Sequence, residues 1–504
     1  MKDFSILGMK MEEVPETVPE YFADLNLDYL IREFARADSE EAAEYYYRMP
    51  ADRETVLYRM AVMKELEEGE MEERLRAFSR RIHQAIEHSR HSREAGQSMS
   101  RAHWHLLAAH EYFTAVEEWK EYLEEKNPSS QGWKDFLTIC REITGERKYR
   151  ENYERLRMVY EKMSNLRYSI RIEGDHISIL PRVLQEDYVG ELRQRFPESI
   201  DMPDRLYTLL PGSQESSALE QRIFQYIRKK NPEPFEEMER LLAECPEFYS
   251  GEIMKFHREI AFYLSFQNFR HYMEERGHCF CYPAFVEGEM TVTGGYDLAL
   301  AFKNLEEGKK TVGNDYYFQE QEQFLVVTGP NQGGKTTFGR AAGQLVYFSR
   351  MGLPVPAEHA RLPYFEGMVT HFSVEESMES GRGKLKEELV RLAPIMHSRQ
   401  RNVFVVINEL FTSAAAYDAY QMGRRVMEHF LGHGCYGIYV THIEELAEET
   451  EQIVSMTAAL EGGDSPVRTY KIFRQPAGGG GYVETIVEQY GLTYENIMRR
   501  LAHD

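Results

Sequence analysis

The residues best suited to chemistry lie between Gly329 and Thr336, in a run that reads Gly-Pro-Asn-Gln-Gly-Gly-Lys-Thr. This run fits the pattern G-x-x-x-x-G-K-[ST] and directly follows an apolar stretch, residues 324–328, that is typical of a buried strand. Glycines allow backbone N–H groups to converge on phosphate oxygens, and a helix that begins at Gly334 would add the positive end of its dipole. Lys335 would then reach the β- and γ-phosphates, while the hydroxyl of Thr336 would be a ligand of Mg²⁺. We therefore predict a nucleotide-binding site here.

A second group of candidate residues follows the apolar run 403–407. Asn408 and Glu409 stand at the end of this expected strand, where a carboxylate holds the Mg²⁺ shell and positions the attacking water in P-loop ATPases. Glu409 is therefore the candidate general base, and the candidate metal ligands are Thr336, Asn408 and Glu409. His442 ends the next expected strand and would bring an imidazole to the same sheet edge, against a γ-phosphate or the water. The competing interpretations are a solvated carboxylate at a strand end and a structural histidine.

The elements that would position these residues divide into two regions. Helical patterning dominates residues 20–166, and it returns after an expected hairpin at residues 168–180. After Pro283 the pattern changes to short apolar runs bounded by turns and separated by helical segments. Such runs are typical of a parallel sheet with helices on both faces. The sequence thus predicts a multidomain chain in which a mainly α-helical region precedes an α/β P-loop domain.

Composition limits the classes of function. With 60 Lys and Arg residues against 83 Asp and Glu residues, the formal net charge is −23, so bulk charge cannot bind nucleic acid. One local exception is the stretch 74–101, which contains seven arginines and two glutamates. This stretch suits contacts with DNA phosphates, but a solvated helix face paired with acidic helices explains it equally well. No apolar run approaches the roughly 18 residues of a membrane span, and the first residues lack a signal-peptide core, so we expect a cytoplasmic protein without a membrane partner.

Several motifs together resemble one protein family. The run Thr328–Thr337 is similar to TGPN-x-GGK-[ST]-[ST], the phosphate-loop motif of the MutS family, which is narrower than a general P-loop pattern. Other segments resemble further motifs of that family: Val312-Gly313-Asn314-Asp315, Gly352-Leu353-Pro354-Val355-Pro356-Ala357, Ser380-Gly381-Arg382 followed by Glu388, and Thr441-His442. The helical segments 52–66 and 258–282 resemble, more weakly, the start of the family's lever helices and the helix that returns to its ATPase domain.

This resemblance implies an ABC-like ATPase domain with ATP and Mg²⁺ as its ligands. The implied ATP contacts are Gly329, Pro330, Asn331, Gln332, Gly333, Gly334, Lys335, Thr336 and Thr337 of the loop, together with Ser380 and Gly381. It also implies a two-fold homodimer with two composite ATP sites. Each site would combine the phosphate loop of one subunit with the Ser380 segment of the other. ATP would then close the dimer and move helical levers that encircle DNA.

The same resemblance divides the chain into three parts. We expect a helical core domain at residues 1–110, lever helices at 111–283 with a short clamp-like insertion at about 175–235, and the ATPase and dimerisation domain at 284–504. We expect neither the family's N-terminal mismatch-reading domain nor its C-terminal Smr nuclease. The implied function is that of a MutS-related ATPase that switches a clamp on mismatched, branched or recombining DNA, as in mismatch repair. A nucleotide-gated mechanical ATPase acting on a ribosome or another protein assembly is the alternative.

Two positions depart from the family pattern. Asn408 stands where the family has aspartate, and Gly383 stands where it has serine. The amide offers Mg²⁺ a neutral oxygen instead of a charged one, and Gly383 lacks the hydroxyl that the resemblance would place on the partner's γ-phosphate. Because Glu409 is retained, we expect ATP hydrolysis that is slow but measurable.

Overall fold

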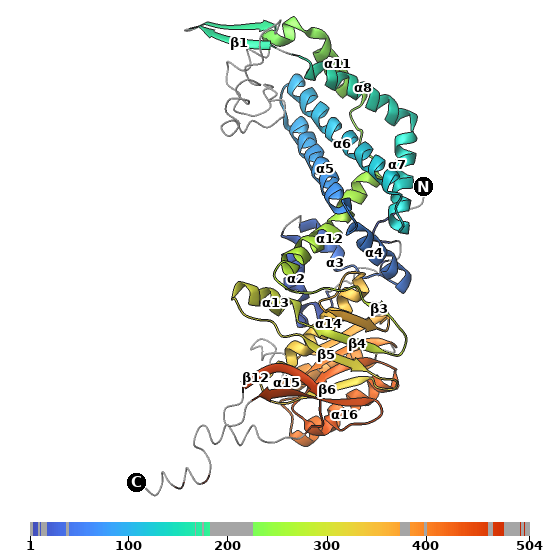
Figure 1. Ribbon diagram of the computed structural model, residues 1–504, viewed down its shortest axis with the longest axis vertical. Helices are drawn as coiled ribbons and strands as arrows, with labels where there is room; N and C mark the ends of the chain where they lie inside the picture. The colour runs from blue at the N-terminus through green and yellow to red at the C-terminus, as the bar shows by residue number, and fades with distance from the viewer. Residues whose placement is uncertain are drawn as a thin grey trace. The chain divides into compact units, whose positions relative to one another are not determined.

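The computed structural model describes most of the chain as two compact units (Figure 1). Unit 1 comprises residues 1–64 and 258–504, and unit 2 comprises residues 65–257. The described residues are 4–8, 11, 18–36, 40–166, 168–173, 176–181, 225–372, 384–397, 401–461, 467–477, 494 and 498. Within these ranges, no helix is both long and apolar enough to cross a membrane.

A six-stranded sheet forms the core of unit 1. Its strand order is β12-β11-β6-β10-β9-β8, in which the strands from β11 to β8 run parallel and β12 pairs antiparallel with β11 at one edge. The strands are β6 (Phe324–Thr328), β8 (Gly367–Phe372), β9 (Val403–Asn408), β10 (Tyr436–Val440), β11 (Ile453–Glu461) and β12 (Val467–Arg474). All residues of β6 and β9 are buried, as expected for strands that are covered on both faces. The predicted parallel sheet is therefore confirmed, with an antiparallel edge strand in addition.

Helices cover both faces of this sheet. The helices in this part of unit 1 are α13 (Leu298–Glu306), α14 (Lys335–Met351), α15 (Lys384–His397) and α16 (Ala416–Gly432). On one face, α14 approaches so closely that a Cβ at Gly339 would lie 3.3 Å from Val406 of β9. On the other face, Val405 belongs to a buried cluster that includes Leu392 of α15 and Phe430 of α16. Since successive strand residues point to opposite faces, Val405 and Val406 place these helices on different sides of the sheet.

A smaller sheet of four strands belongs to the same unit, with the order β3-β7-β4-β5. Its strands are β3 (Ala284–Phe285), β4 (Met290–Gly295), β5 (Asn314–Phe318) and β7 (His359–Leu362). The helix α13 follows β4, and the Asp297 carboxylate caps its first turn by accepting a hydrogen bond from Leu300 N at 3.1 Å. This sheet and α13 supply the segment between Leu298 and Asn314, which borders the site described below.

The first helices of the chain belong to the same unit as the large sheet. They are α1 (Tyr21–Asp24), α2 (Leu27–Ala35), α3 (Glu40–Tyr46) and α4 (Arg53–Leu66). Two buried hydrogen bonds join this part of the chain to α14: Gln344 Nε2 donates to the carbonyl oxygen of Leu25 at 2.9 Å, and the Tyr347 hydroxyl donates to that of Tyr46 at 2.6 Å. The division of the chain therefore differs from the expected core domain at 1–110, because the residues up to 64 pack with the sheet and its helices.

Unit 2 is built mainly from long helices. It contains α5 (Met71–Glu94), α6 (Ser98–Lys126), α7 (Gln131–Gly145), α8 (Arg147–Ser164), α11 (Pro232–Glu244), the first residues of α12 (Gly251–Glu274) and the hairpin of β1 (Tyr168–Glu173) and β2 (His176–Pro181). The predicted hairpin is thus confirmed. The helices α5 and α6 lie side by side (Figure 1), and α6 runs without a break through the expected boundary between residues 110 and 111. Most of the expected clamp-like insertion, residues 182–224, lies outside the described residues.

We predict that Gly352→Ala destabilises unit 1. Gly352 has a φ of +75°, and an added Cβ would lie 2.8 Å from the carbonyl oxygen of Val56 and 2.7 Å from Cβ of Arg59. Because these atoms belong to or adjoin the backbone of α4, we expect the free energy of unfolding to fall by at least ~2 kcal/mol. Thermal unfolding followed by circular dichroism measures the change. The control is Gly432→Ala, since a Cβ at Gly432 would meet no atom within 4 Å; equal midpoints for both variants would contradict the prediction.

Candidate nucleotide-binding site

The loop between β6 and α14 has a backbone conformation that depends on its glycines. Gly329 and Gly334 have φ values of +117° and +92°, which glycine adopts without steric cost. A Cβ at Gly333 would lie 2.9 Å from Cβ of Ala458 in β11 and 3.0 Å from the carbonyl oxygen of Pro330. A tight loop of this kind at the N-terminus of a helix is suited to bind an anion through backbone N–H groups.

Lys335, the first residue of α14, is buried against this loop. The residue is 4% exposed, and its Nζ donates hydrogen bonds to the carbonyl oxygens of Gly329 at 2.8 Å and Pro330 at 3.0 Å. Burial lowers the pKa of the ammonium group, while the nearby Glu409 carboxylate acts in the opposite direction. The loop therefore holds a cation where it can neutralise a phosphate group.

The next residue links the start of α14 to the end of β9. Thr336 Oγ1 donates a hydrogen bond to Asn408 Oδ1 at 2.9 Å, and Asn408 is only 7% exposed. Mg²⁺ prefers oxygen ligands and usually keeps water and substrate phosphates in its shell beside one or two protein groups. The side-chain oxygens of Thr336, Asn408 and the adjacent Glu409 therefore fit Mg²⁺. The described residues contain no group of three or more His, Cys, Asp or Glu side chains that could hold a metal ion by themselves.

Glu409 is paired with the candidate histidine. His442 Nε2 lies 2.8 Å from Glu409 Oε1. The backbone of Glu409 has a φ of +55°, and its N–H donates to the carbonyl oxygen of Val440 at 2.9 Å. A positive φ is unfavourable for a residue with a side chain, and such strain is concentrated at functional sites. The Glu409 side chain is 28% exposed, so its carboxylate is accessible to water while the imidazole orients it.

A cavity of about 390 Å³ is lined by the loop, the first turn of α14 and Glu409. Its volume is within the usual range of small-molecule sites. Lys309, Lys310, Asn314 and Tyr470 also line it. Asn314 fixes the neighbouring edge strand, because its Nδ2 donates to the carbonyl oxygen of Tyr470 at 3.2 Å and its Oδ1 accepts from the N–H of Ile472 in β12 at 2.8 Å.

Sequence reasoning gave these additional lining residues no role. Asn314 belongs to the motif Val312–Asp315, and this motif is the feature of the sequence that could have indicated a role for it. No motif in the sequence indicates Tyr470. It lies in the edge strand β12, 156 residues further along the chain than Asn314, and only the fold brings it to the cavity.

The structure brings most of the predicted site residues together. The cavity is lined by Asn331, Gln332, Gly334, Lys335, Thr336, Thr337 and Glu409. Gly329, Pro330 and Gly333 belong to the same loop, Asn408 contacts Thr336, and His442 contacts Glu409. Ser380 and Gly381 lie outside the described residues, as does Gly383.

A glycine-rich loop at a helix N-terminus, with polar side chains at the carboxyl ends of neighbouring parallel strands, is the arrangement with which open α/β domains commonly bind nucleotides. Residues 325–473 match the family model described as MutS domain V. The part of the chain that contains the site is thus similar to a domain of the MutS family, in agreement with the resemblance of its motifs.

Three curated relatives show how far the similarity extends. The DNA mismatch repair protein MutS of Thermotoga petrophila is 28% identical over 195 residues, which cover 38% of this chain and 24% of that protein. The DNA mismatch repair protein msh-2 of Neurospora crassa is 28% identical over 153 residues, or 29% of this chain and 16% of the relative. The DNA mismatch repair protein MSH2 of Saccharomyces cerevisiae is 27% identical over 144 residues, which cover 28% of this chain and 15% of that protein. The chain therefore matches about a quarter of the length of these relatives or less.

We predict that Lys335→Ala weakens ATP binding at least ~30-fold, because it removes the buried cation and its charge-assisted hydrogen bonds. Isothermal titration calorimetry with a non-hydrolysable ATP analogue measures the dissociation constant, and circular dichroism checks that the fold is kept. Lys303→Ala is the control, since Lys303 is an exposed lysine of α13 that does not line the cavity. Undiminished affinity in Lys335→Ala would refute the assignment of the phosphate loop.

Proposed function

We propose that this chain is a MutS-type ATPase that binds ATP with Mg²⁺, hydrolyses it slowly and uses the nucleotide to switch a homodimeric clamp on DNA. The observation that carries this proposal is the meeting of Lys335, the Thr336–Asn408 pair and the Glu409–His442 pair at one sheet edge. A fixed cation, oxygen ligands for a metal ion and a water-accessible carboxylate are the parts that hydrolysis of a phosphoanhydride requires.

Each group has a defined task in the proposed reaction. Lys335 and the N–H groups of the loop bind the β- and γ-phosphates. Bound Mg²⁺ supplies positive charge that neutralises the phosphate oxygens. Glu409 orients the attacking water and accepts its proton, and His442 holds the carboxylate through their 2.8 Å contact.

The slow turnover in this proposal follows from the neutral side-chain oxygen that Asn408 offers as a metal ligand. Asn408 offers a neutral oxygen that already accepts the Thr336 hydroxyl at 2.9 Å. Contacts of a charged acceptor are stronger than those of a neutral one by roughly 1–2 kcal/mol. We therefore expect the chemical step to be about ten- to thirtyfold slower than with an aspartate at this position.

We predict that Glu409→Gln abolishes ATP turnover and leaves ATP binding within about threefold of the parent. The amide cannot accept a proton from water, whereas Lys335 and the loop are untouched. Phosphate release under single-turnover conditions measures the chemical step, and titration with the ATP analogue measures binding. Glu444→Gln, in the segment just after His442, is the control and should hydrolyse ATP like the parent. If Glu409→Gln hydrolyses ATP as fast as the parent, Glu409 is not the general base.

A dimer and a DNA partner complete the proposal. Ser380 and Gly381 of one subunit would contact the nucleotide of the other, so that ATP closes the dimer. The matched relatives are named DNA mismatch repair proteins. In unit 2, three arginines of the 74–101 stretch are exposed and form no ion pair among the described residues: Arg80, Arg93 and Arg101. These three side chains are available for phosphate contacts.

A mechanical ATPase acting on a protein or ribonucleoprotein assembly is the second candidate, and charge favours it. The chain carries a formal net charge of −23. The other arginines of the stretch are already paired with glutamates: Arg74 with Glu70, Arg76 with Glu72, Arg81 with Glu111, and Arg90 with Glu87. Paired side chains of this kind contribute little to binding an external phosphate backbone.

Replacement of Arg80, Arg93 and Arg101 by glutamine distinguishes the two candidates. If these side chains bind DNA phosphates, the slope of log affinity against log salt concentration should fall by about 2.7, at about 0.9 for each phosphate that is no longer neutralised. Fluorescence anisotropy with duplex and four-way-junction DNA over a range of salt concentrations measures the slope.

The control for this experiment removes the same charge from unit 1. Glutamine replaces three exposed residues, Lys303, Arg424 and Arg425, and we expect the salt slope to stay as in the parent. Equal salt slopes for the arginine variant and the parent would show that these three arginines do not contact DNA phosphates. A parent that binds neither DNA at low salt would favour the non-DNA candidate.

A further inference from the structure

The helix α15 carries a fully buried carboxylate that reaches the segment containing the candidate general base. Glu388 is 0% exposed, and its Oε2 accepts a hydrogen bond from the backbone N–H of Phe411 at 3.1 Å. Phe411 follows Glu409 by two residues. A buried carboxylate is costly unless it is hydrogen-bonded, so the contact between Glu388 and this backbone is a strong restraint on both.

The segment from Glu409 to Phe411 has a backbone that needs such a restraint. Glu409 and Phe411 have φ values of +55° and +62°, in the region that favours glycine. The N–H of Glu409 is held by the carbonyl oxygen of Val440 at 2.9 Å, and that of Phe411 is held by Glu388. Leu410 and Phe411 are 2% and 1% exposed in the cluster that covers one face of the sheet. Strained backbone persists only where its surroundings fix it, and Glu388 is one of the groups that fix it here.

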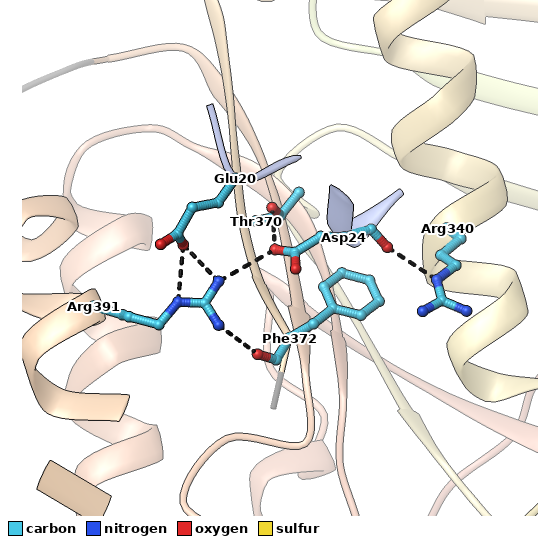
Figure 2. A network of polar contacts seen from close by, with 6 residues as sticks. All are labelled: Glu20, Asp24, Arg340, Thr370, Phe372 and Arg391. Carbon is cyan, nitrogen blue, oxygen red and sulfur yellow. Dashed lines mark hydrogen bonds and ion pairs between the residues drawn. The ribbon is translucent and has the colours of Figure 1, made fainter. Parts of the chain in front are cut away.

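Close to Glu388, the same helix is anchored to α1 (Figure 2). Arg391 Nε donates to Glu20 Oε2 at 2.9 Å, and its Nη1 donates to the carbonyl oxygen of Phe372, the last residue of β8, at 3.1 Å. The guanidinium also lies 3.7 Å from Asp24 Oδ2, which accepts a hydrogen bond from the Thr370 hydroxyl at 2.6 Å. One side chain of α15 is thereby fixed against both α1 and the edge strand of the large sheet.

The helix α1 is tied in turn to the helix that carries the phosphate-loop lysine. Arg340 Nε, in the second turn of α14, donates to the carbonyl oxygen of Asp24 at 2.9 Å. Figure 2 shows Asp24 between Arg340 and Arg391. A continuous series of contacts therefore runs from α14 through α1 to α15, and from α15 to the backbone beside Glu409.

We propose that Glu388 is a positioning residue for Glu409, and that α15 transmits the position of α1 to this carboxylate. The proposal rests on ATP hydrolysis at the site described above. Glu388 does not touch the reacting groups; it keeps the strained Glu409–Phe411 segment in the conformation that presents Glu409 to water. A displacement of α15 away from β9 would release Phe411 N and let Glu409 leave that conformation. The contacts that hold α15 to α1 then control the rate of ATP hydrolysis. They do not control the affinity for ATP.

Steady-state ATP hydrolysis and ATP titration in the full chain test this proposal. For Glu388→Gln we expect kcat to fall about tenfold, equivalent to about 1.4 kcal/mol, because a neutral acceptor holds the Phe411 N–H more weakly. The ATP dissociation constant should stay within about twofold of the parent, a split that general unfolding of the site would not give. Glu387→Gln changes the adjacent carboxylate of the same helix and should leave kcat unchanged. A parent-like kcat in Glu388→Gln, or an equal loss in both variants, overturns the proposal.

A second variant, Arg391→Gln, tests the link to α1. It weakens the contacts with Glu20 and Asp24, and we expect kcat to fall about threefold with unchanged ATP affinity. The double variant with Glu388→Gln should be no slower than Glu388→Gln alone, because both changes act through one segment. Multiplicative losses in the double variant overturn the link. If Glu388→Gln does not fold, Arg391→Gln decides alone, and an unchanged kcat overturns the proposal.

Failure of the proposed function gives a different result. If the parent shows no turnover above that of Glu409→Gln, the ATPase assignment itself fails. If turnover is lost in Glu409→Gln but fully kept in Glu388→Gln, the ATPase assignment stands and only the positioning role is removed.

Discussion

Three neighbouring strands end in register, and the site depends on that alignment. Val327 of β6 pairs with Val440 of β10, and Val440 pairs with Asn408 of β9. The phosphate loop, the Glu409–Phe411 segment and the turn with His442 therefore leave the sheet at one edge. A shift of one residue in any of these strands would turn its side chains to the opposite face. Because the strand residues are buried on both faces, packing far from the cavity fixes the positions of the polar groups around it.

The helix α14 is enclosed between this sheet and the first helices of the chain, and small residues make the enclosure possible. A Cβ at Gly343 would lie 2.7 Å from the Leu25 side chain, and a Cβ at Gly339 would lie 3.3 Å from Val406 of β9. Close backbone approach of this kind leaves little freedom to a helix in a densely packed interior. Lys335 is therefore carried by a helix that moves only together with its neighbours.

Local patterns in the sequence were sufficient to place the Gly329–Thr336 run between a strand and a helix, and to place Asn408 and Glu409 at the end of a strand. A strand, a glycine-rich turn and a helix follow one another within a short stretch, and the apolar run before Glu409 marks its strand directly. The packing of α1 to α3 on α14 could not be predicted, because hydrophobic periodicity indicates which face of a helix is buried but not its partner. The expected domain boundary at residue 110 lies inside α6, because periodicity does not show which helices pack into one domain. Glu388 was noted only as part of a motif; its hydrogen bond to Phe411 depends on how α15 packs on the sheet.

The order of segments along the chain has a consequence for synthesis on the ribosome. Unit 2 is one continuous stretch, whereas unit 1 is assembled from both ends of the chain. The carbonyl of Leu25 and the Gln344 side chain that binds it are separated by 319 residues. At about 5–20 residues per second, the first helices emerge roughly 15–60 s before the helix that covers them. Phe22 and Phe34, which are 0% exposed in the finished protein, remain uncovered during that interval. Unit 2 is therefore the first part of the nascent chain that can complete its fold, and unit 1, which contains the candidate site, is the last.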